Sequence, residues 1–126
     1  MAVPLAVLSW QAEAVVRLLV AAAMGGAIGL EREQHGRSAG FRTQLLVALG
    51  SALAMVVSLH FAQQYGSVSA ATALRIDPAR VAYGIMGGIG FLGAGAIIRH
   101  GTGVRGMTTA ASLWCTAAVG MACGFG

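Results

Sequence analysis

Four apolar stretches, separated by short polar segments, set the pattern of the chain. They run from about residue 10 to 30, 44 to 62, 78 to 99 and 108 to 125. Each stretch is apolar on every side, which is typical of helices in lipid and not of the alternating strands of a barrel. A helix over residues 78–99 would extend for about 33 Å, enough to cross the hydrocarbon core of a bilayer. The pattern therefore predicts four membrane-spanning helices.

Capping signals predict where three of these helices begin. Ser9 precedes the first helix, and Glu13 lies in its first turn, where the helix dipole favours an acid. Thr43 occupies the N-cap position of the second helix. Asp77 and Pro78 combine a capping carboxylate with a proline at the first helical position of the third.

The composition agrees with a lipid-embedded chain. Hydrophobic residues make up 57% of the sequence and charged residues only 10%, whereas a soluble domain carries about 25% charged residues. The basic residues are arginines scattered singly between apolar stretches, although nucleic-acid-binding proteins concentrate such charge on one face. We therefore expect an all-α, polytopic transmembrane helix bundle. It should form one domain over residues 1–126, contact the lipid bilayer and bind no nucleic acid.

The distribution of arginine in the loops predicts the orientation. The loops at 31–43 and 99–108 share one side of the membrane and hold five arginines, whereas the other side holds Arg75 and Arg80. Short cytoplasmic loops are enriched in arginine. The two arginine-rich loops are therefore expected in the cytoplasm, and the N-terminus in the periplasm or outside the cell.

Small residues recur at four-residue steps on the predicted helices. Such spacing lets helix backbones approach closely in membranes. We interpret these positions as tight helix–helix contacts, within one chain or between the chains of a homo-oligomer. The four sets are Ala21, Gly25 and Gly29; Gly50, Ala54 and Ser58; Gly84 and Gly88; and Gly120 and Gly124.

The glycine run of the third stretch matches G-x-G-x-x-G over residues 88–93. A dinucleotide fingerprint needs a strand before it and an acidic residue about 20 positions later, and this stretch has neither. Two interpretations remain for Gly88, Gly90, Gly93 and Gly95: close packing, or a local helix break. A break would expose backbone groups that can bind an ion or a substrate.

Arg17 is the charged residue that lies well inside a predicted span. An intramembrane arginine usually has a partner or faces water. Glu13, one helical step away, is a candidate partner. Alternatively, the long side chain reaches the outer headgroups.

The two arginine-rich loops hold the densest group of polar residues. Glu31 and Glu33 lie at a helix C-terminus, where the dipole disfavours acids, so we expect arginines of the same side to offset them. One interpretation is a site for an anion or for the acidic group of a partner. The other is a structural ion-pair network, and both can hold together. The candidate residues are Glu31, Arg32, Glu33, Gly40, Arg42, Thr43, Arg99, Arg105, Gly106, Thr108 and Thr109.

Catalytic and metal-binding patterns are missing from the sequence. His35, His60 and His100 lack the spacing of metal ligands. Magnesium is usually bound through one or two carboxylates, and no Asp or Glu lies in the middle of a span. We therefore expect no enzymatic activity, no metal site and no cofactor. A magnesium path would have to use backbone carbonyls, hydroxyl groups and water.

Several long motifs resemble the MgtC/SapB family of bacterial inner-membrane proteins. The resemblance extends from about residue 17 to residue 126. The motifs that carry it are the GGAIGLERE of residues 25–33, the AGFRT of 39–43, the GIGFLGAG of 88–95, the RGMTTAA of 105–111 and the LW of 113–114.

The resemblance implies a domain linked to growth in low magnesium and to virulence. It also implies a regulator of other membrane proteins, among them the F-type ATP synthase. Because family members usually carry a fifth span, and some a soluble C-terminal domain, the chain is expected to be truncated at its C-terminus. The favoured hypothesis is a regulator of magnesium-linked ion homeostasis, acting as a homo-oligomer. The alternative is a transporter or channel for a divalent cation such as Mg²⁺.

Overall fold

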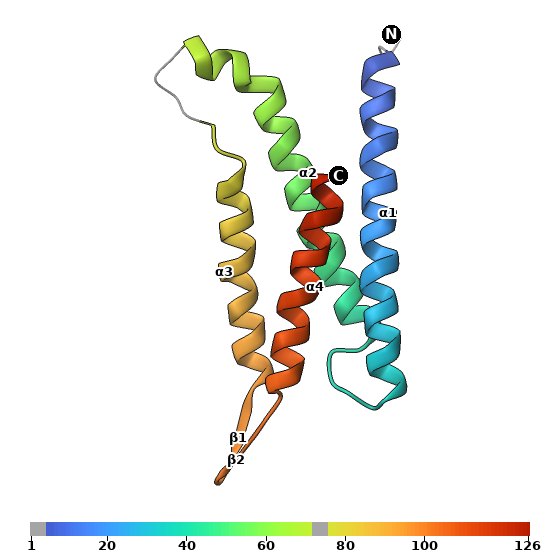
Figure 1. The fold of residues 1–126 in the computed structure, drawn as a ribbon, viewed down its shortest axis with the longest axis vertical. Helices are drawn as coiled ribbons and strands as arrows, with labels where there is room; N and C mark the ends of the chain where they lie inside the picture. Colours follow the sequence, from blue (N-terminus) through green and yellow to red (C-terminus); the bar gives the residue numbers. More distant parts are fainter. Residues whose placement is uncertain (1–4, 72–75) are drawn as a thin grey trace.

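Four packed helices make up the computed structural model, which describes residues 5–71 and 76–126 (Figure 1). This arrangement confirms the predicted all-helical bundle. Two three-residue strands, which were not predicted, form an antiparallel hairpin between the third and fourth helices. The elements are α1 (Leu5–Gln34), α2 (Phe41–Ala71), α3 (Ala79–Ala96), β1 (Ile98–His100), β2 (Gly103–Arg105) and α4 (Met107–Phe125).

Two of the predicted helix starts are wrong. α1 begins at Leu5, before Ser9, because Leu and Ala are strong helix formers and extend the helix into the N-terminal residues. α2 begins at Phe41 rather than after Thr43, and its first amide donates to the Glu33 carboxylate instead of a threonine hydroxyl. At the start of α3, Asp77 Oδ1 accepts a hydrogen bond from the amide of Ala79 at 3.0 Å, as a capping acid should.

The third helix is shorter than predicted. It ends at Ala96 rather than Arg99, and Ile97 is already extended (φ −91°, ψ 115°). The β-branched residues that follow favour a strand. Gly101, with φ +57°, supplies the left-handed turn that pairs the two strands. The last residues of the predicted span thus form β1.

Small residues build the interior of the bundle. Ala48 and Ala52 of α2 are fully buried. A Cβ atom added at Gly120 of α4 would lie 2.2 Å from the Ala48 carbonyl oxygen, and one at Gly124 would lie 2.5 Å from that of Ala52. Helix backbones pack this closely in membranes only where side chains are absent. α4 therefore packs directly on α2, with α1 and α3 on either side in Figure 1.

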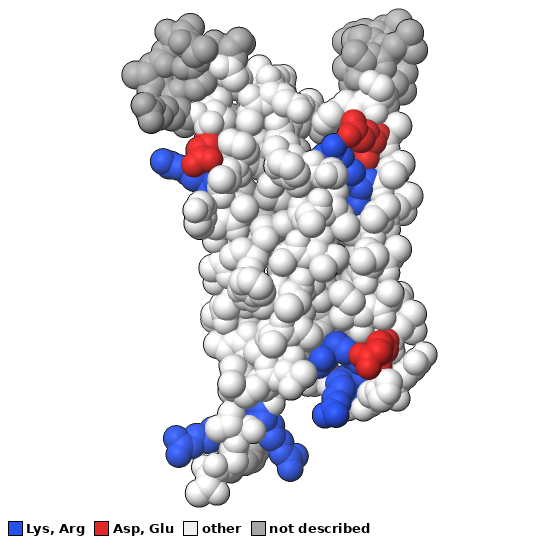
Figure 2. Space-filling model, viewed as in Figure 1, with Lys and Arg blue, Asp and Glu red and all other residues white. Residues whose placement is uncertain are grey.

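The outer surface is apolar along the helices and charged at the two ends. Leu19 and Leu46 are each 63% exposed, and Phe91 is 82% exposed. Figure 2 shows charged atoms gathered near the ends of the bundle and an uncharged belt between them. By length and composition, α1, α2 and α4 can each cross a membrane, and α3 is not among these three helices. The chain is therefore an integral membrane protein.

Candidate functional site

We call the end of the bundle that carries the α1–α2 loop and the β-hairpin the hairpin end (Figure 1). At this end, α1 stops in a C-terminal turn in which Gly36 adopts φ +62°. The amide of Arg37 donates to the Arg32 carbonyl at 2.9 Å, and that of Gly36 to the Glu33 carbonyl at 3.0 Å. This pair of hydrogen bonds is the Schellman motif, and it turns the chain back towards α4.

Arg32 is the central side chain of the hairpin end. It is only 6% exposed, and its guanidinium donates to the Ser38 carbonyl at 2.7 Å, to the Ala39 carbonyl at 3.2 Å and to Thr109 Oγ1 at 2.8 Å. Ser38 Oγ and Thr109 Oγ1 also lie 3.0 Å apart. Because a buried charge is tolerated only when it is well hydrogen-bonded, these contacts fix the loop and α4 on the end of α1.

Ala39 shows how tightly this loop is held. It adopts φ +57°, a left-handed conformation that side chains other than those of Gly, Asn and Asp rarely adopt. Its carbonyl accepts from Arg32 and, at 3.3 Å, from the buried Gln44. Gln44 also donates to Ser112 Oγ at 3.0 Å and thereby joins α2 to α4. We call Arg32, Ser38, Ala39, Gln44, Thr109 and Ser112 the Arg32 cluster.

Sequence reasoning found Arg32 and Thr109 but missed Ser38, Gln44 and Ser112. The signal at Gln44 was a polar residue at the start of an otherwise apolar stretch. The sequence had no comparable signal for Ser38 or Ser112, because both residues are common in loops and in membrane helices.

The two glutamates of the loop have partners other than arginine. Glu31 pairs with His35, with 3.2 Å between Oε1 and Nδ1. Glu33 Oε2 accepts from the amide of Phe41 at 2.9 Å and so caps α2. Gly40 leaves space for the Glu33 carboxylate, because a Cβ atom at Gly40 would lie 2.8 Å from Glu33 Oε2. The expected pairing of these acids with Arg42, Arg99 or Arg105 does not occur among the described residues.

The remaining arginines of the hairpin end are exposed. Arg99 donates only to the carbonyl of Gly101, at 3.2 Å. For Arg37, Arg42 and Arg105, the described part of the chain offers neither a hydrogen-bond acceptor nor an acid to the guanidinium. The candidate residues therefore divide into a buried group that holds the fold and an outer group that is open to ligands.

A polar cavity of about 610 Å³ lies between the α1–α2 loop and the start of α4. Arg37 of the α1–α2 loop and Arg105 of β2 line it, with Thr108 and Thr109 of the first turn of α4. Gly106 precedes this turn with φ +90°, and a Cβ atom there would lie 1.8 Å from the Ala96 carbonyl oxygen. A helix N-terminus flanked by two unpaired guanidinium groups is electropositive and suits an anionic group.

Arg17 lies near the opposite end of the bundle. Its Nη1 donates to the carbonyls of Gly124 and Phe125, at 2.9 Å each, and its Nη2 to Glu13 at 2.5 Å. The guanidinium thus satisfies the last carbonyls of α4, where a cation is favoured. Glu13 is thus the partner of Arg17, as one of the two alternatives predicted. The other alternative, that the long side chain reaches the outer headgroups, stays a prediction.

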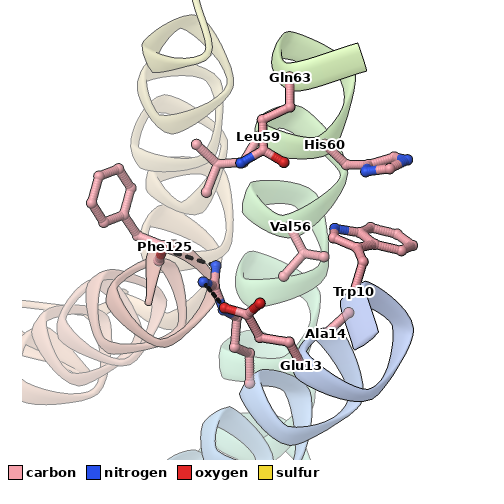
Figure 3. Close-up of a pocket in the computed structure, with 9 residues that line it drawn as sticks. Trp10, Glu13, Ala14, Val56, Leu59, His60, Gln63 and Phe125 are labelled. Atoms are coloured by element: carbon pink, nitrogen blue, oxygen red, sulfur yellow. Dashed lines mark hydrogen bonds and ion pairs between the residues drawn. The ribbon is translucent and has the colours of Figure 1, made fainter. Parts of the chain in front are cut away.

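A cavity of about 270 Å³ adjoins Arg17. Figure 3 shows His60 and Trp10 beside it, with ring centroids 3.8 Å apart, and the two side chains come from α2 and α1. Glu13 and Gln63 complete its polar lining.

The predicted glycines divide into two groups. A Cβ atom at Gly25 would lie 2.6 Å from the Gln44 carbonyl oxygen, and one at Gly29 would lie 2.6 Å from the Phe41 Cα. At Gly93, the nearest atom would be Ala110 Cβ at 3.6 Å, an ordinary contact. An added Cβ would meet no atom within 4 Å at Gly88, Gly90 or Gly95, and α3 runs through all of them without interruption. The interpretation of this run as a helix break is therefore not supported, since the helical hydrogen bonds continue past it.

Comparison with known proteins places these features in a family. Residues 18–126 match the model of the MgtC family. The chain belongs to the MgtC family. It is 44% identical over 115 residues to a protein of Escherichia coli named putative magnesium transporter YhiD, covering 91% of this chain and 52% of that protein.

Two further MgtC family relatives have similar identity. Protein MgtC of Salmonella typhimurium is 44% identical over 112 residues, which cover 89% of this chain and 43% of that protein. An uncharacterized protein of Synechocystis is 43% identical over 114 residues, which cover 90% of this chain and 44% of that protein. The chain thus spans about half the length of the curated relatives it matches. No solved structure matches it.

Proposed function

We propose that this MgtC family chain is a non-catalytic regulator of magnesium-linked ion homeostasis that acts by binding another membrane protein. The observation that carries the proposal is the pair of unpaired guanidinium groups, Arg37 and Arg105, on the rim of the polar cavity. The Arg32 cluster holds this cavity in a fixed shape, so its charges are arranged before a partner arrives. An acidic segment of a partner would supply the missing anions.

The orientation follows from the same arginines. We propose that the hairpin end faces the cytoplasm of a bacterial inner membrane, because arginine in short loops is enriched on that side. The partner segment would then be cytoplasmic. By family resemblance, the F-type ATP synthase is a candidate partner, and its cytoplasmic part is accessible from that side.

We also propose that the chain forms a homo-oligomer through α3. Added Cβ atoms at Gly84 and Gly88, one helical step of four residues apart, would meet nothing within 4 Å. An open face of small residues on a membrane helix lets a second helix backbone approach closely.

Transport of a divalent cation remains a second candidate, favoured by the name of the Escherichia coli relative. A cation path needs oxygen ligands along its length. The two cavities beside the middle of α2 are lined mainly by apolar side chains such as Leu46, Leu53 and Val57. The polar cavities described above lie near the two ends instead, which supports regulation over transport.

The proposal is tested by reconstituting the chain with F-type ATP synthase in lipid vesicles and measuring ATP-driven proton uptake. The wild-type chain is expected to lower the rate. The double variant Arg37→Glu/Arg105→Glu should lose this effect, because reversed charges repel an acidic segment. Arg80→Glu is the matched control, since Arg80 is also exposed but lies in the first turn of α3, at the opposite end.

Equal inhibition by the wild-type chain and the double variant would show that the cavity between Arg37 and Arg105 does not bind the ATP synthase. Proton uptake that is unchanged by the wild-type chain would exclude the ATP synthase as its partner.

A further inference from the structure

The faces of α2 and α3 leave a long apolar groove between them. α3 packs mainly on α4 and touches α2 little, apart from the Ser58 hydroxyl, which donates to the Pro78 carbonyl at 3.2 Å. Two cavities, of about 510 and 720 Å³, lie along this groove and share Gly50 in their walls. The first is lined by Leu46, Val47, Ile85, Ile89 and Leu92 among others.

Arg42 lies at the solvent-exposed end of this groove. Together with Thr43 it lines the apolar cavity of about 510 Å³ and also a polar cavity of about 580 Å³ at the hairpin end. Its guanidinium is exposed and has no acid or hydrogen-bond acceptor within the described residues. At the unpaired guanidinium of Arg42, the lining of the site therefore changes from the polar cavity to the apolar groove.

The length of the first apolar cavity of this groove matches one half of a bilayer. From Arg42 to Ser51, the ends of the apolar cavity along α2, the helix rises about 14 Å. One leaflet occupies about half of a hydrocarbon core of about 30 Å. A ligand with an anionic head at Arg42 and one apolar chain of this length would fill both the polar cavity and the apolar cavity that Arg42 joins.

We propose that the α2–α3 groove is a binding site for one membrane phospholipid, with its phosphate at Arg42 and one acyl chain along the groove past Gly50. The unpaired guanidinium complements the phosphate. Glu33 also lines the polar cavity beside Arg42, but its Oε2 already accepts from the Phe41 amide, so Arg42 is the group that attracts the anion. A second copy of this chain is a poorer occupant. Two copies in the same orientation that joined through this groove would bring their Arg42 side chains to the same depth, where like charges repel.

The experiment is a titration of the purified chain in detergent with phosphatidylglycerol, followed by native mass spectrometry. Diacylglycerol, which has the same chains and no phosphate, is the second probe. Arg42→Ala is expected to weaken phosphatidylglycerol binding by about tenfold or more, because hydrogen bonds to charged groups are strong. It should leave diacylglycerol binding unchanged.

Two further variants complete the test. Gly50→Leu should weaken the binding of both probes, since its side chain would enter the groove, where an added Cβ meets no atom within 4 Å. Circular dichroism should first show that this variant is folded. Arg37→Ala is the matched control and should change neither, because Arg37 lines the cavity at α4 instead.

Equal phosphatidylglycerol binding by the wild-type chain, Arg42→Ala and Arg37→Ala would overturn the proposal and leave only general lipid contact. A dimer that Gly50→Leu converts to a monomer would also overturn it, because the groove would then hold a second copy.

Discussion

Arg32 in α1 donates a hydrogen bond of 2.8 Å to the Thr109 hydroxyl in the first turn of α4, 77 positions later in the chain. Both side chains are buried, and the same guanidinium holds the carbonyls of Ser38 and Ala39 in the intervening loop. One charged side chain thus sets the relative position of three segments at the hairpin end. The polar cavity between Arg37 and Arg105 depends on that arrangement.

Arg32→Ala is expected to lower the free energy of unfolding by about 2–4 kcal/mol, because each hydrogen bond to a charged group contributes about 1.5–3 kcal/mol. Thr109→Val keeps the shape of the side chain and should lower it by about 1 kcal/mol. Because the two side chains are in contact, the double variant should deviate from additivity by about 1 kcal/mol. The measurement is reversible unfolding in mixed detergent–lipid micelles.

The control for this double-mutant cycle is Arg37→Ala. Arg37 is an exposed arginine of the α1–α2 loop, so its replacement should change stability by no more than about 0.5 kcal/mol. Strict additivity of Arg32→Ala and Thr109→Val would show that the bond between them does not stabilise the fold.

Two glycines of similar sequence context should respond oppositely to alanine. Gly120→Ala places a Cβ atom 2.2 Å from the Ala48 carbonyl oxygen, so overpacking should lower stability by about 1–3 kcal/mol. At Gly84 an added Cβ meets nothing within 4 Å in a single chain, so in the monomeric form Gly84→Ala should raise stability by up to about 1 kcal/mol through helix propensity. Thermal unfolding of both variants checks this, and a loss at Gly84 as large as at Gly120 would contradict the assigned packing.

Removal of the Arg17 side chain should loosen the end of α4. In Arg17→Ala the carbonyls of Gly124 and Phe125 lose the guanidinium that donates to them. Hydrogen exchange at the last turn of α4 is expected to rise, while exchange in the first turn of α4 stays unchanged. Glu13→Gln should have a smaller effect, because Arg17 keeps both carbonyls. Identical exchange in Arg17→Ala and the wild-type chain would show that the cap is dispensable.

The proposed orientation predicts one-sided labelling of introduced cysteines. Cys115 and Cys123 are first replaced by alanine, since both are free thiols. Thr102→Cys, in the hairpin turn, should react with an impermeant maleimide only after the cytoplasmic side is opened. Gln63→Cys, beside the cavity at the opposite end, should react in intact cells stripped of their outer membrane. The reverse pattern would invert the topology and place the basic cavity outside.

The apolar pattern was sufficient to predict the four helices, because burial in lipid requires long runs without charge. It could not predict the hairpin: Ile97 and Ile98 are as apolar as the helix before them, and the strand depends on β-branching and on the turn at Gly101. Nor could spacing alone separate close packing at Gly25 and Gly29 from open faces at Gly84 and Gly88, since all four share one pattern.

At the site, the sequence identified the right segments but not their pairings. Arg32, Arg42 and Arg105 look alike in the sequence, and only the fold shows that the first is buried while the others are exposed. Glu33 was expected to face an arginine, yet the amide of Phe41 takes that place. Pairings of this kind depend on the path of the α1–α2 loop, which is set by the left-handed residues Gly36 and Ala39.

The central claim, that this chain regulates a partner and moves no ion itself, is tested most directly by flux of Mg²⁺ into vesicles that hold only this chain. Circular dichroism and a single oligomeric peak must first show that the reconstituted protein is folded. We predict a rate equal to that of protein-free vesicles, with the wild-type chain and Arg42→Ala alike. Saturable Mg²⁺ uptake by the wild-type chain, abolished by Arg42→Ala, would contradict the account and assign a transport path to the α2–α3 side of the bundle.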